Sequence, residues 1–211
     1  MPTDASLRAL RILRDGGQFQ WYVIPLLALV LYVYATEVER RNWKVVYAGM
    51  AFWGMDWFNE ICNGLVFHFT QYAPVWGTPG GTAYLILIGL NIEICFMFAI
   101  AGIAVAKTLP ADRHMPVIGL PNRWVIAACG ALFCVVVELF LNAAGALTWD
   151  YRWWNAGAPW LIFLLGYLPF FLVSFWVHDM PDRRRQRRTV SAILGVDIIG
   201  LALFGGLLEW V

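Results

Sequence analysis

Long apolar stretches alternate with short polar segments along the whole chain. A helix needs about 20 apolar residues to cross roughly 30 Å of hydrocarbon. Six stretches match this pattern, and the first is short enough that it could lie partly at the interface. They are Phe19–Ala35, Val45–Phe69, Thr82–Ala106, Trp124–Thr148, Pro159–Val177 and Val190–Val211. We therefore expect an all-α fold, a polytopic membrane helical bundle with about six transmembrane helices, formed by residues 1–211 as a single transmembrane domain.

A different pattern precedes the first apolar stretch. Leucines at positions 7, 10 and 13 alternate with Arg8, Arg11 and Arg14, which predicts an interfacial amphipathic helix within residues 1–18, lying on the membrane surface. A cleaved signal peptide is the alternative. We reject it because the following apolar run passes into Glu37 and Glu39 without a small-residue cleavage site.

Composition agrees with a membrane location and excludes other classes. Hydrophobic residues make up 61% of the chain and charged residues only 14%, whereas soluble domains are about half apolar and a quarter charged. A net charge of +1 leaves no general basic surface, so we expect no nucleic-acid partner. The expected partners are membrane lipid and a hydrophobic small molecule. The sequence does not indicate an oligomeric state.

The distribution of basic residues predicts the orientation. Eleven Lys and Arg residues follow the first, third and fifth apolar stretches, against four on the opposite side. Cytoplasmic loops retain Lys and Arg, so both termini are expected outside the cytoplasm. The expected location is the cytoplasmic membrane of a bacterium.

Two parts of the chain, residues 45–106 and 124–178, have similar patterns. Each has an acid and an amide in a helix, then an aromatic outer loop, then an apolar stretch. The matching positions are Glu60 and Glu138, Asn63 and Asn142, Tyr72 and Tyr151, and Trp76 and Trp154. This pattern predicts a parallel duplication of a helix pair, with the chemistry between the two copies. Chance similarity between apolar, aromatic-rich segments is the alternative.

Acidic residues at membrane depth are the main candidates for function, because they are costly there unless they face a polar interior. Asp56, Glu60 and Asn63 share one helical face. Counted from the outer ends of the predicted helices, Glu60, Glu93 and Glu138 all lie roughly 14–17 Å deep. The three carboxyl groups are thus expected in one layer near the midplane.

Carboxyl groups crowded in an apolar layer cannot all be ionised, so one or more should be neutral at pH 7. A neutral buried carboxylic acid is a proton donor. No Lys or Arg lies within these stretches, which favours protonated acids or a bound cation over ion pairs. A purely structural network, in which the acids bond to amides and hold helices together, is the alternative.

Other motifs are weak. The three histidines are scattered, and the four cysteines lie inside apolar stretches without a Cys-x-x-Cys pair. We found no phosphate-binding loop, dinucleotide fingerprint or nucleophile elbow. We therefore expect no metal site and no cofactor.

The Trp-rich segment Trp53-Gly-Met-Asp56-Trp57-Phe-Asn-Glu60, the second acid at Glu138-Leu-Phe-Leu-Asn142 and the aromatic outer loops resemble membrane-integral isoprenoid cyclases. The similar families are the small meroterpenoid cyclases and the lycopene-type carotenoid cyclases. The resemblance implies that membrane carboxyl groups protonate an epoxide or alkene of a hydrophobic substrate.

The leading hypothesis is an enzyme that cyclises or isomerises an isoprenoid-like lipid. Glu60 would donate the proton, and Glu138 or Glu93 would be the counter-group. Asp56 would complete the catalytic set as an orienting group. The substrate-binding residues would be Asn63, Asn91 and Asn142, the cavity walls Trp53, Trp57 and Phe67, and the loop residues Tyr72 and Trp149. A proton- or cation-coupled transporter and an accessory subunit of a larger membrane complex are the alternatives.

Overall fold

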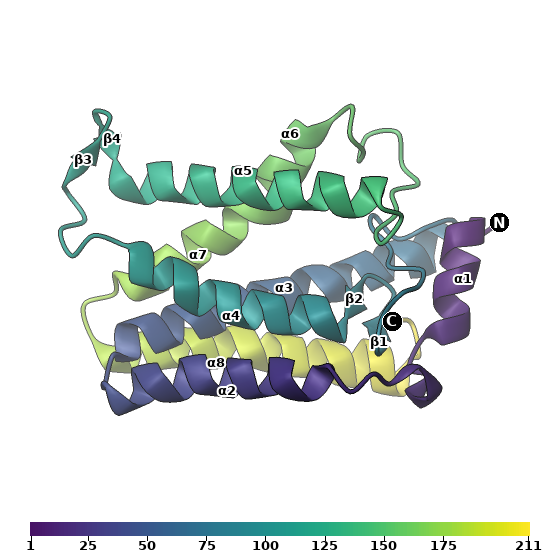
Figure 1. Cartoon of the computed structure of the whole chain (residues 1–211), viewed down its shortest axis with the longest axis horizontal. Coiled ribbons are helices and arrows are strands. Elements are labelled where there is room, and N and C mark those ends of the chain that lie inside the picture. The colour runs from purple at the N-terminus through teal and green to yellow at the C-terminus, as the bar shows by residue number, and fades with distance from the viewer.

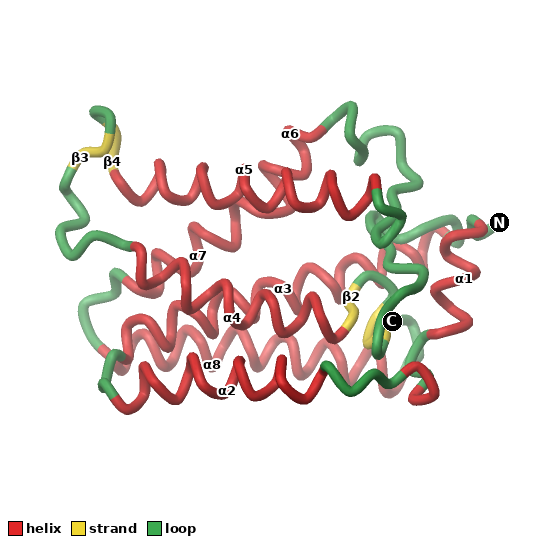
Figure 2. Tube along the Cα trace, viewed as in Figure 1, coloured by secondary structure: helices red, strands yellow, loops and turns green.

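The computed structural model describes residues 1–211, and long helices running in alternating directions dominate it (Figure 1). A short helix α1 precedes them, and small hairpins connect some of them (Figure 2). The helices are α1 (Asp4–Ile12), α2 (Val23–Glu39), α3 (Trp43–Thr70), α4 (Ile92–Thr108), α5 (Asn122–Ala143), α6 (Pro159–Leu161), α7 (Leu168–His178) and α8 (Arg183–Gly200). A 3-10 turn covers Gly16–Gln18, π-helical segments cover Ile162–Tyr167 and Leu201–Leu207, and the strands are β1 (Leu85–Leu87), β2 (Leu90–Asn91), β3 (Pro116–Val117) and β4 (Leu120–Pro121).

The fold is all-α and of membrane type. Three helices are long and apolar enough to cross a membrane, namely Asn122–Ala143, Pro159–His178 and Arg183–Leu207. The helices α2 and α4 have 17 residues each, slightly fewer than the roughly 20 that a perpendicular span requires. The longer α3, with 28 residues, carries the buried acids Asp56 and Glu60. The structure therefore establishes three candidate spans rather than the expected six.

The predicted helix Thr82–Ala106 is wrong in its first part. Strands β1 and β2 pair there as an antiparallel hairpin, and α4 begins only at Ile92, where the Asn91 side chain accepts a hydrogen bond from Ile94 N over 2.8 Å. An Asn in this position is a favourable N-cap. Apolar runs such as Leu85–Leu90 suit a buried strand as well as a helix, so hydrophobicity alone could not separate them.

Helices α6 and α7 are parts of one continuous helix, and the π-helical segment Ile162–Tyr167 joins them. Pro169 lies just after this segment and lacks the backbone N–H that an α-helix would use there. The side-chain amide of Asn59 on α3 donates to the Gly166 carbonyl over 3.5 Å, which links the π-helical segment to α3.

Helix α3 lies at the centre and packs against α2, α4, α7 and α8. Close packing with α4 depends on glycines, because a Cβ on Gly102 would come within 2.7 Å of the Gly49 carbonyl oxygen. Helix α5 packs chiefly against α7 and against the π-helical segment that precedes α7. In Figure 1, α5 lies apart from α4. Two helix pairs, α3 with α4 and α5 with α7, thus face each other.

Both termini, α1, the β1–β2 hairpin and the loop 144–158 lie at one end of the helices (Figure 1). Two loops meet there directly, because Gly77 and Thr148 exchange backbone hydrogen bonds of 3.0 and 2.8 Å. Helix α1 forms where an amphipathic helix was expected and packs Ala9 against Leu85 and Ile88 of the hairpin.

Candidate functional site

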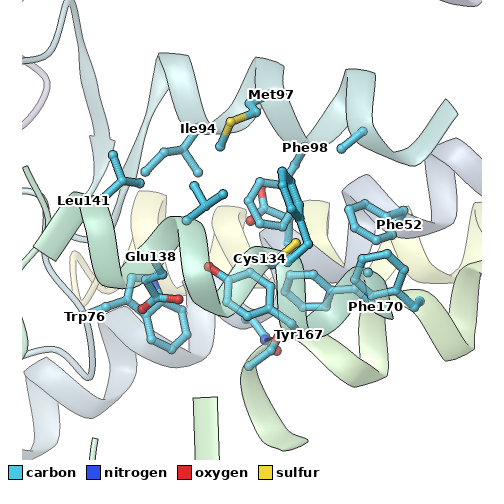
Figure 3. Close-up of a pocket in the computed structure, with 18 of the residues that line it drawn as sticks. Phe52, Trp76, Ile94, Met97, Phe98, Cys134, Glu138, Leu141, Tyr167 and Phe170 are labelled. Atoms are coloured by element: carbon cyan, nitrogen blue, oxygen red, sulfur yellow. Dashed lines mark hydrogen bonds between the residues drawn. The ribbon is translucent and has the colours of Figure 1, made fainter. Parts of the chain in front are cut away.

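A cavity of about 300 Å³ lies between the two helix pairs, and most of its lining is apolar (Figure 3). Four acid or amide side chains line it: Asp56, Asn59 and Glu60 from α3 and Glu138 from α5. No Lys, Arg or His is part of the lining. The cavity therefore combines an apolar interior with an excess of acidic groups.

Glu60 is held by the loop that follows α3. The indole Nε1 of Trp76 donates to Glu60 Oε1 over 2.7 Å, and the Asn63 amide lies 3.4 Å from Oε2. Asn63 also accepts from Val75 N at 2.7 Å and donates to the Trp76 carbonyl at 2.8 Å, so it fixes the loop to the helix. Glu60 and Asn63 are 3% and 1% exposed.

A glycine allows the β1–β2 hairpin to approach this group. A Cβ on Gly89 would lie 2.3 Å from Asn63 Nδ2 and 2.7 Å from Glu60 Oε2. Real side chains do not approach so closely, so any residue with a side chain at position 89 would force the Asn63 amide, the Glu60 carboxyl group or the hairpin itself to shift. The hairpin thus forms part of the wall beside Glu60.

Glu138 has a comparable environment on the opposite helix pair. Trp149 Nε1 donates to Glu138 Oε1 over 2.9 Å, and the phenol of Tyr167 lies next to the carboxyl group in the cavity (Figure 3). Like Glu60, Glu138 is buried. Each acid therefore comes from a helix and receives an indole N–H from the loop after that helix.

Matching aromatic residues of the two similar segments touch each other. The Trp76 and Trp154 rings stack with centroids 5.7 Å apart, and the Tyr72 and Tyr151 rings meet edge to face at 5.5 Å. The cavity lies directly between the segments, where a duplication would place the site. The duplication itself stays a prediction.

Asp56 differs from the two glutamates. It lines the cavity and is 3% exposed, yet its Oδ2 has no hydrogen-bond partner. Asp197 on α8 is similarly buried, and neither of its carboxyl oxygens has a partner. Buried polar atoms are rarely left without a partner, so these two acids stand out in the molecule.

Glu93 does not line the cavity. It lies in the first turn of α4, where it accepts hydrogen bonds from Tyr22, from Thr82 Oγ1 at 2.6 Å and from Ala83 N at 2.7 Å. The helix that carries it begins at Ile92 and not near Thr82, so the position of Glu93 cannot be counted from Thr82 as the sequence prediction did. Asn91, the N-cap of α4, also lies outside the cavity lining.

The residues predicted as cavity walls lie elsewhere. Trp53 donates to Cys95 Sγ over 3.4 Å, Trp57 packs near Ile61, and Phe67 packs against α1 and the hairpin. None of the three lines the cavity, and neither do Tyr72, Trp149 or Asn142. Tyr72 donates to the Asp150 carbonyl and Asn142 to the Leu147 carbonyl.

The aromatic walls instead come from residues that were not predicted as walls. Trp76 and Trp154 were identified only as matching positions of the two similar segments. The other aromatic residues were not singled out: Phe52, Phe98, Tyr167 and Phe170 (Figure 3), and Phe171. A signal for Phe52 was present, because it lies four residues before Asp56 and therefore on the same helical face. No sequence pattern pointed to Tyr167, the last residue of the π-helical segment.

The cavity reaches the outer surface of the helices between α4 and α5. Its lining includes Met97 on α4, which is 45% exposed, and Phe133 on α5, which is 69% exposed. Lipid chains cover such an apolar surface in a membrane. No group of three or more His, Cys, Asp or Glu side chains is arranged to hold a metal ion.

Comparison with known proteins gives a family. A model described as an uncharacterized membrane protein family matches residues 3–206. An uncharacterized protein of Archaeoglobus fulgidus is 58% identical over 211 residues, which cover all of both chains. A second protein of that archaeon is 55% identical over 53 residues, covering 25% of this chain and 95% of its own. No solved structure matches.

These matches support a membrane protein and leave the finer expectations open. Both relatives are archaeal, so they give no support for a bacterial membrane. None of the matches is described as an isoprenoid cyclase. Because the family model covers nearly the whole chain, the chain belongs to this family of membrane proteins.

Proposed function

We propose that the protein is an integral membrane enzyme that acts on a hydrophobic, isoprenoid-like substrate by acid–base chemistry between Glu60 and Glu138. The observation that carries the proposal is that two buried carboxyl groups, one from each helix pair, line a single apolar cavity that reaches the lipid-facing surface.

The two glutamates can hold and move a proton. Each is fixed by an indole N–H, from Trp76 for Glu60 and from Trp149 for Glu138. No basic side chain in the lining neutralises them, so the pair is best satisfied when at least one carboxyl group carries a proton. A positioned acid of this kind typically contributes about 10²- to 10⁴-fold to a reaction rate.

The aromatic walls suit a substrate that becomes positively charged when it accepts this proton. Faces of aromatic rings attract cations, and Phe52, Phe98 and Phe170 line the cavity beyond the acids. The predominantly apolar lining keeps water away from a reactive cation. Cyclisation or isomerisation after protonation of an alkene or epoxide fits this environment.

For the membrane arrangement, we propose six spans with both termini on the non-cytoplasmic side. The long helices alternate in direction (Figure 1), which supports this number although α2 and α4 are short. The loops between these helices, with the adjoining helix ends, then form the cytoplasmic end within residues 40–44, 107–123 and 179–188, which carries most of the basic residues.

Deuterium incorporation tests the enzyme directly. Purified protein in nanodiscs is incubated in D₂O with an extract of archaeal isoprenoid lipids, and the products are analysed by mass spectrometry. An acid-catalysed cyclase transfers a deuteron from Glu60 to carbon, so a product with a new C–D bond should form. A carrier would leave the mass of every lipid unchanged.

Two matched variants assign the role. Glu60→Gln keeps the shape of the side chain but removes the proton donor, and should lower the rate at least about 100-fold. Glu93→Gln makes the same change in a glutamate outside the cavity and should leave the rate within a few fold. Equal rates of deuterated product in Glu60→Gln and the wild type would overturn the proposal.

A further inference from the structure

We propose that the cavity binds an apolar chain whose polar end donates hydrogen bonds and carries no negative charge, such as a prenyl alcohol, and that this ligand enters from the bilayer between α4 and α5. The inference rests on the proposed function, because it assigns a ligand class to the same cavity. Beyond the proposed function, it specifies the head groups that the cavity accepts, the carboxyl group that binds the head group and the route by which the ligand enters.

The charges in the cavity select the head group. Three carboxyl groups, from Asp56, Glu60 and Glu138, line it without any Lys, Arg or His. A carboxylate or diphosphate head would add negative charge in a buried place that offers no cation, and an unpaired buried charge is strongly unfavourable. A hydroxyl or ammonium group would instead find acceptors on every side.

Asp56 is the acceptor that lacks a donor. Glu60 and Glu138 already receive N–H groups from Trp76 and Trp149. In contrast, Asp56 Oδ2 is buried and without a partner, although the side chain lines the cavity. Since nearly all buried polar atoms are paired, this oxygen indicates a donor that the ligand brings.

Asp197 provides a matched control within the same molecule. It is 4% exposed and its two carboxyl oxygens have no partner. It lies at the α3–α8 contact, where a Cβ on Gly54 would be 3.4 Å from its Oδ2, and it is not part of the cavity lining. Both aspartates thus have little exposed surface, and only Asp56 lines the cavity.

The route of entry follows from the exposed part of the lining. Met97 and Ala104 of α4 and Phe133 of α5 line the cavity and are also exposed on the outer surface. Helix α5 packs chiefly against α7 and the preceding π-helical segment. A chain dissolved in the membrane can therefore enter sideways between α4 and α5 without passing through water.

Competition binding tests the head group. The wild-type protein in nanodiscs of zwitterionic phospholipid is loaded with tritium-labelled farnesol, and empty nanodiscs are the blank. Farnesylamine, farnesoic acid and farnesyl diphosphate, which share the tail, are then added as competitors at pH 8. Farnesol and farnesylamine should displace the label at least about tenfold more effectively than either anion. Equal or stronger displacement by an anion would overturn the inference.

Two substitutions test the acceptor. Asp56→Leu should weaken farnesol binding at least about tenfold, which corresponds to one lost hydrogen bond to an acid, whereas Asp197→Leu should leave it within about threefold. Both changes replace an unpaired buried acid by an apolar side chain of similar size, so both variants should fold as well as the wild type. Equal losses in the two variants, or no loss in Asp56→Leu, would show that Asp56 is not the acceptor.

A bulky residue tests the entrance. Ala104→Trp, at the edge of the opening, should slow farnesol association about tenfold, while Ala202→Trp, on the exposed surface of the helix that follows α8, should not change it. Equal association rates in the two variants would contradict entry between α4 and α5. These measurements need no turnover, so farnesol binding without a deuterated product would reject the enzyme and leave the ligand class intact.

Discussion

The indole nitrogen of Trp76 donates a hydrogen bond of 2.7 Å to the Glu60 carboxyl group, 16 residues earlier in the chain. This contact joins a loop to the central helix α3 at the wall of the cavity. It also leaves the Trp76 ring free to stack with Trp154 of the opposite segment. One side chain therefore fixes the acid and connects the two helix pairs.

Replacing Trp76 tests the value of this hydrogen bond. Trp76→Phe keeps an aromatic ring but leaves a buried carboxyl oxygen without its donor, which costs about 1–3 kcal/mol. Trp154→Phe is the matched control, because Trp154 Nε1 has no partner to lose. Thermal unfolding in detergent should show a lower midpoint for Trp76→Phe. Equal midpoints in the two variants would mean that the indole N–H contributes nothing.

Gly89, which lies beside Glu60, is the basis of a second prediction. Gly89→Ala would place a Cβ 2.3 Å from Asn63 Nδ2, so the hairpin or the amide must move. Overpacking of this kind costs about 1–3 kcal/mol, and it should also lower the activity because the Asn63 amide and the hairpin both lie against Glu60. Gly80→Ala, where nothing lies within 4 Å of the added Cβ, should match the wild type in both measurements. A fully active Gly89→Ala would contradict the close approach.

The beginning of α4 can be tested through its cap. Asn91→Ala removes the side chain that accepts from Ile94 N, and loss of an N-cap costs about 1 kcal/mol. If residues 82–91 were instead part of a longer helix, Asn91 would be interior and alanine would stabilise the protein. The sign of the change in the unfolding midpoint therefore distinguishes the hairpin from the helix that the sequence predicted.

An ion pair at the end of α7 gives a pH prediction. Burial raises the pKa of Asp179, but hydrogen bonds from the Arg123 guanidinium, at 2.8 Å to each carboxyl oxygen, and from His178 outweigh burial and hold that pKa below its usual value. A lowered pKa in the folded state stabilises the protein above the unfolded pKa of about 3.9, and this contribution is lost as the pH falls through the folded value.

Asp179→Asn should therefore destabilise the protein at pH 7 by about 1 kcal/mol, a value reduced for solvent screening. The difference from the wild type should shrink as the pH is lowered below about 4. Unfolding midpoints of both proteins between pH 7 and pH 3 check this trend. A difference that stays constant over this range would show that the carboxylate charge is not responsible.

Hydrophobic patterning predicted most helices within a few residues. It found α3, α5 and the helix of α6 and α7, because each is a long apolar run that ends near a change in polarity. It failed between Thr82 and Leu90, since an apolar hairpin packed inside the protein has the same composition as a buried helix. The helical count from Thr82 to Glu93 rested on the same error.

For the site, sequence spacing identified the acids better than their surroundings. Asp56, Glu60 and Asn63 lie on one buried face of α3, and Glu138 faces the same cavity. The cavity walls were predicted from aromatic residues close in sequence to the acids, such as Trp53 and Trp57. These side chains do not line the cavity, so the true wall residues were not predicted. Contacts between distant segments, such as Trp76 with Trp154, follow from tertiary packing that no local pattern contains.

The exposed opening between α4 and α5 has a consequence for kinetics. If a substrate reaches the acids only through this opening, its effective concentration is its ratio to lipid in the bilayer and not its concentration in water. The rate should then follow the mole fraction of substrate in the bilayer, and dilution with inert phospholipid at constant total substrate should slow the reaction. The relevant collision is two-dimensional, so the fluidity of the surrounding membrane becomes part of the rate law.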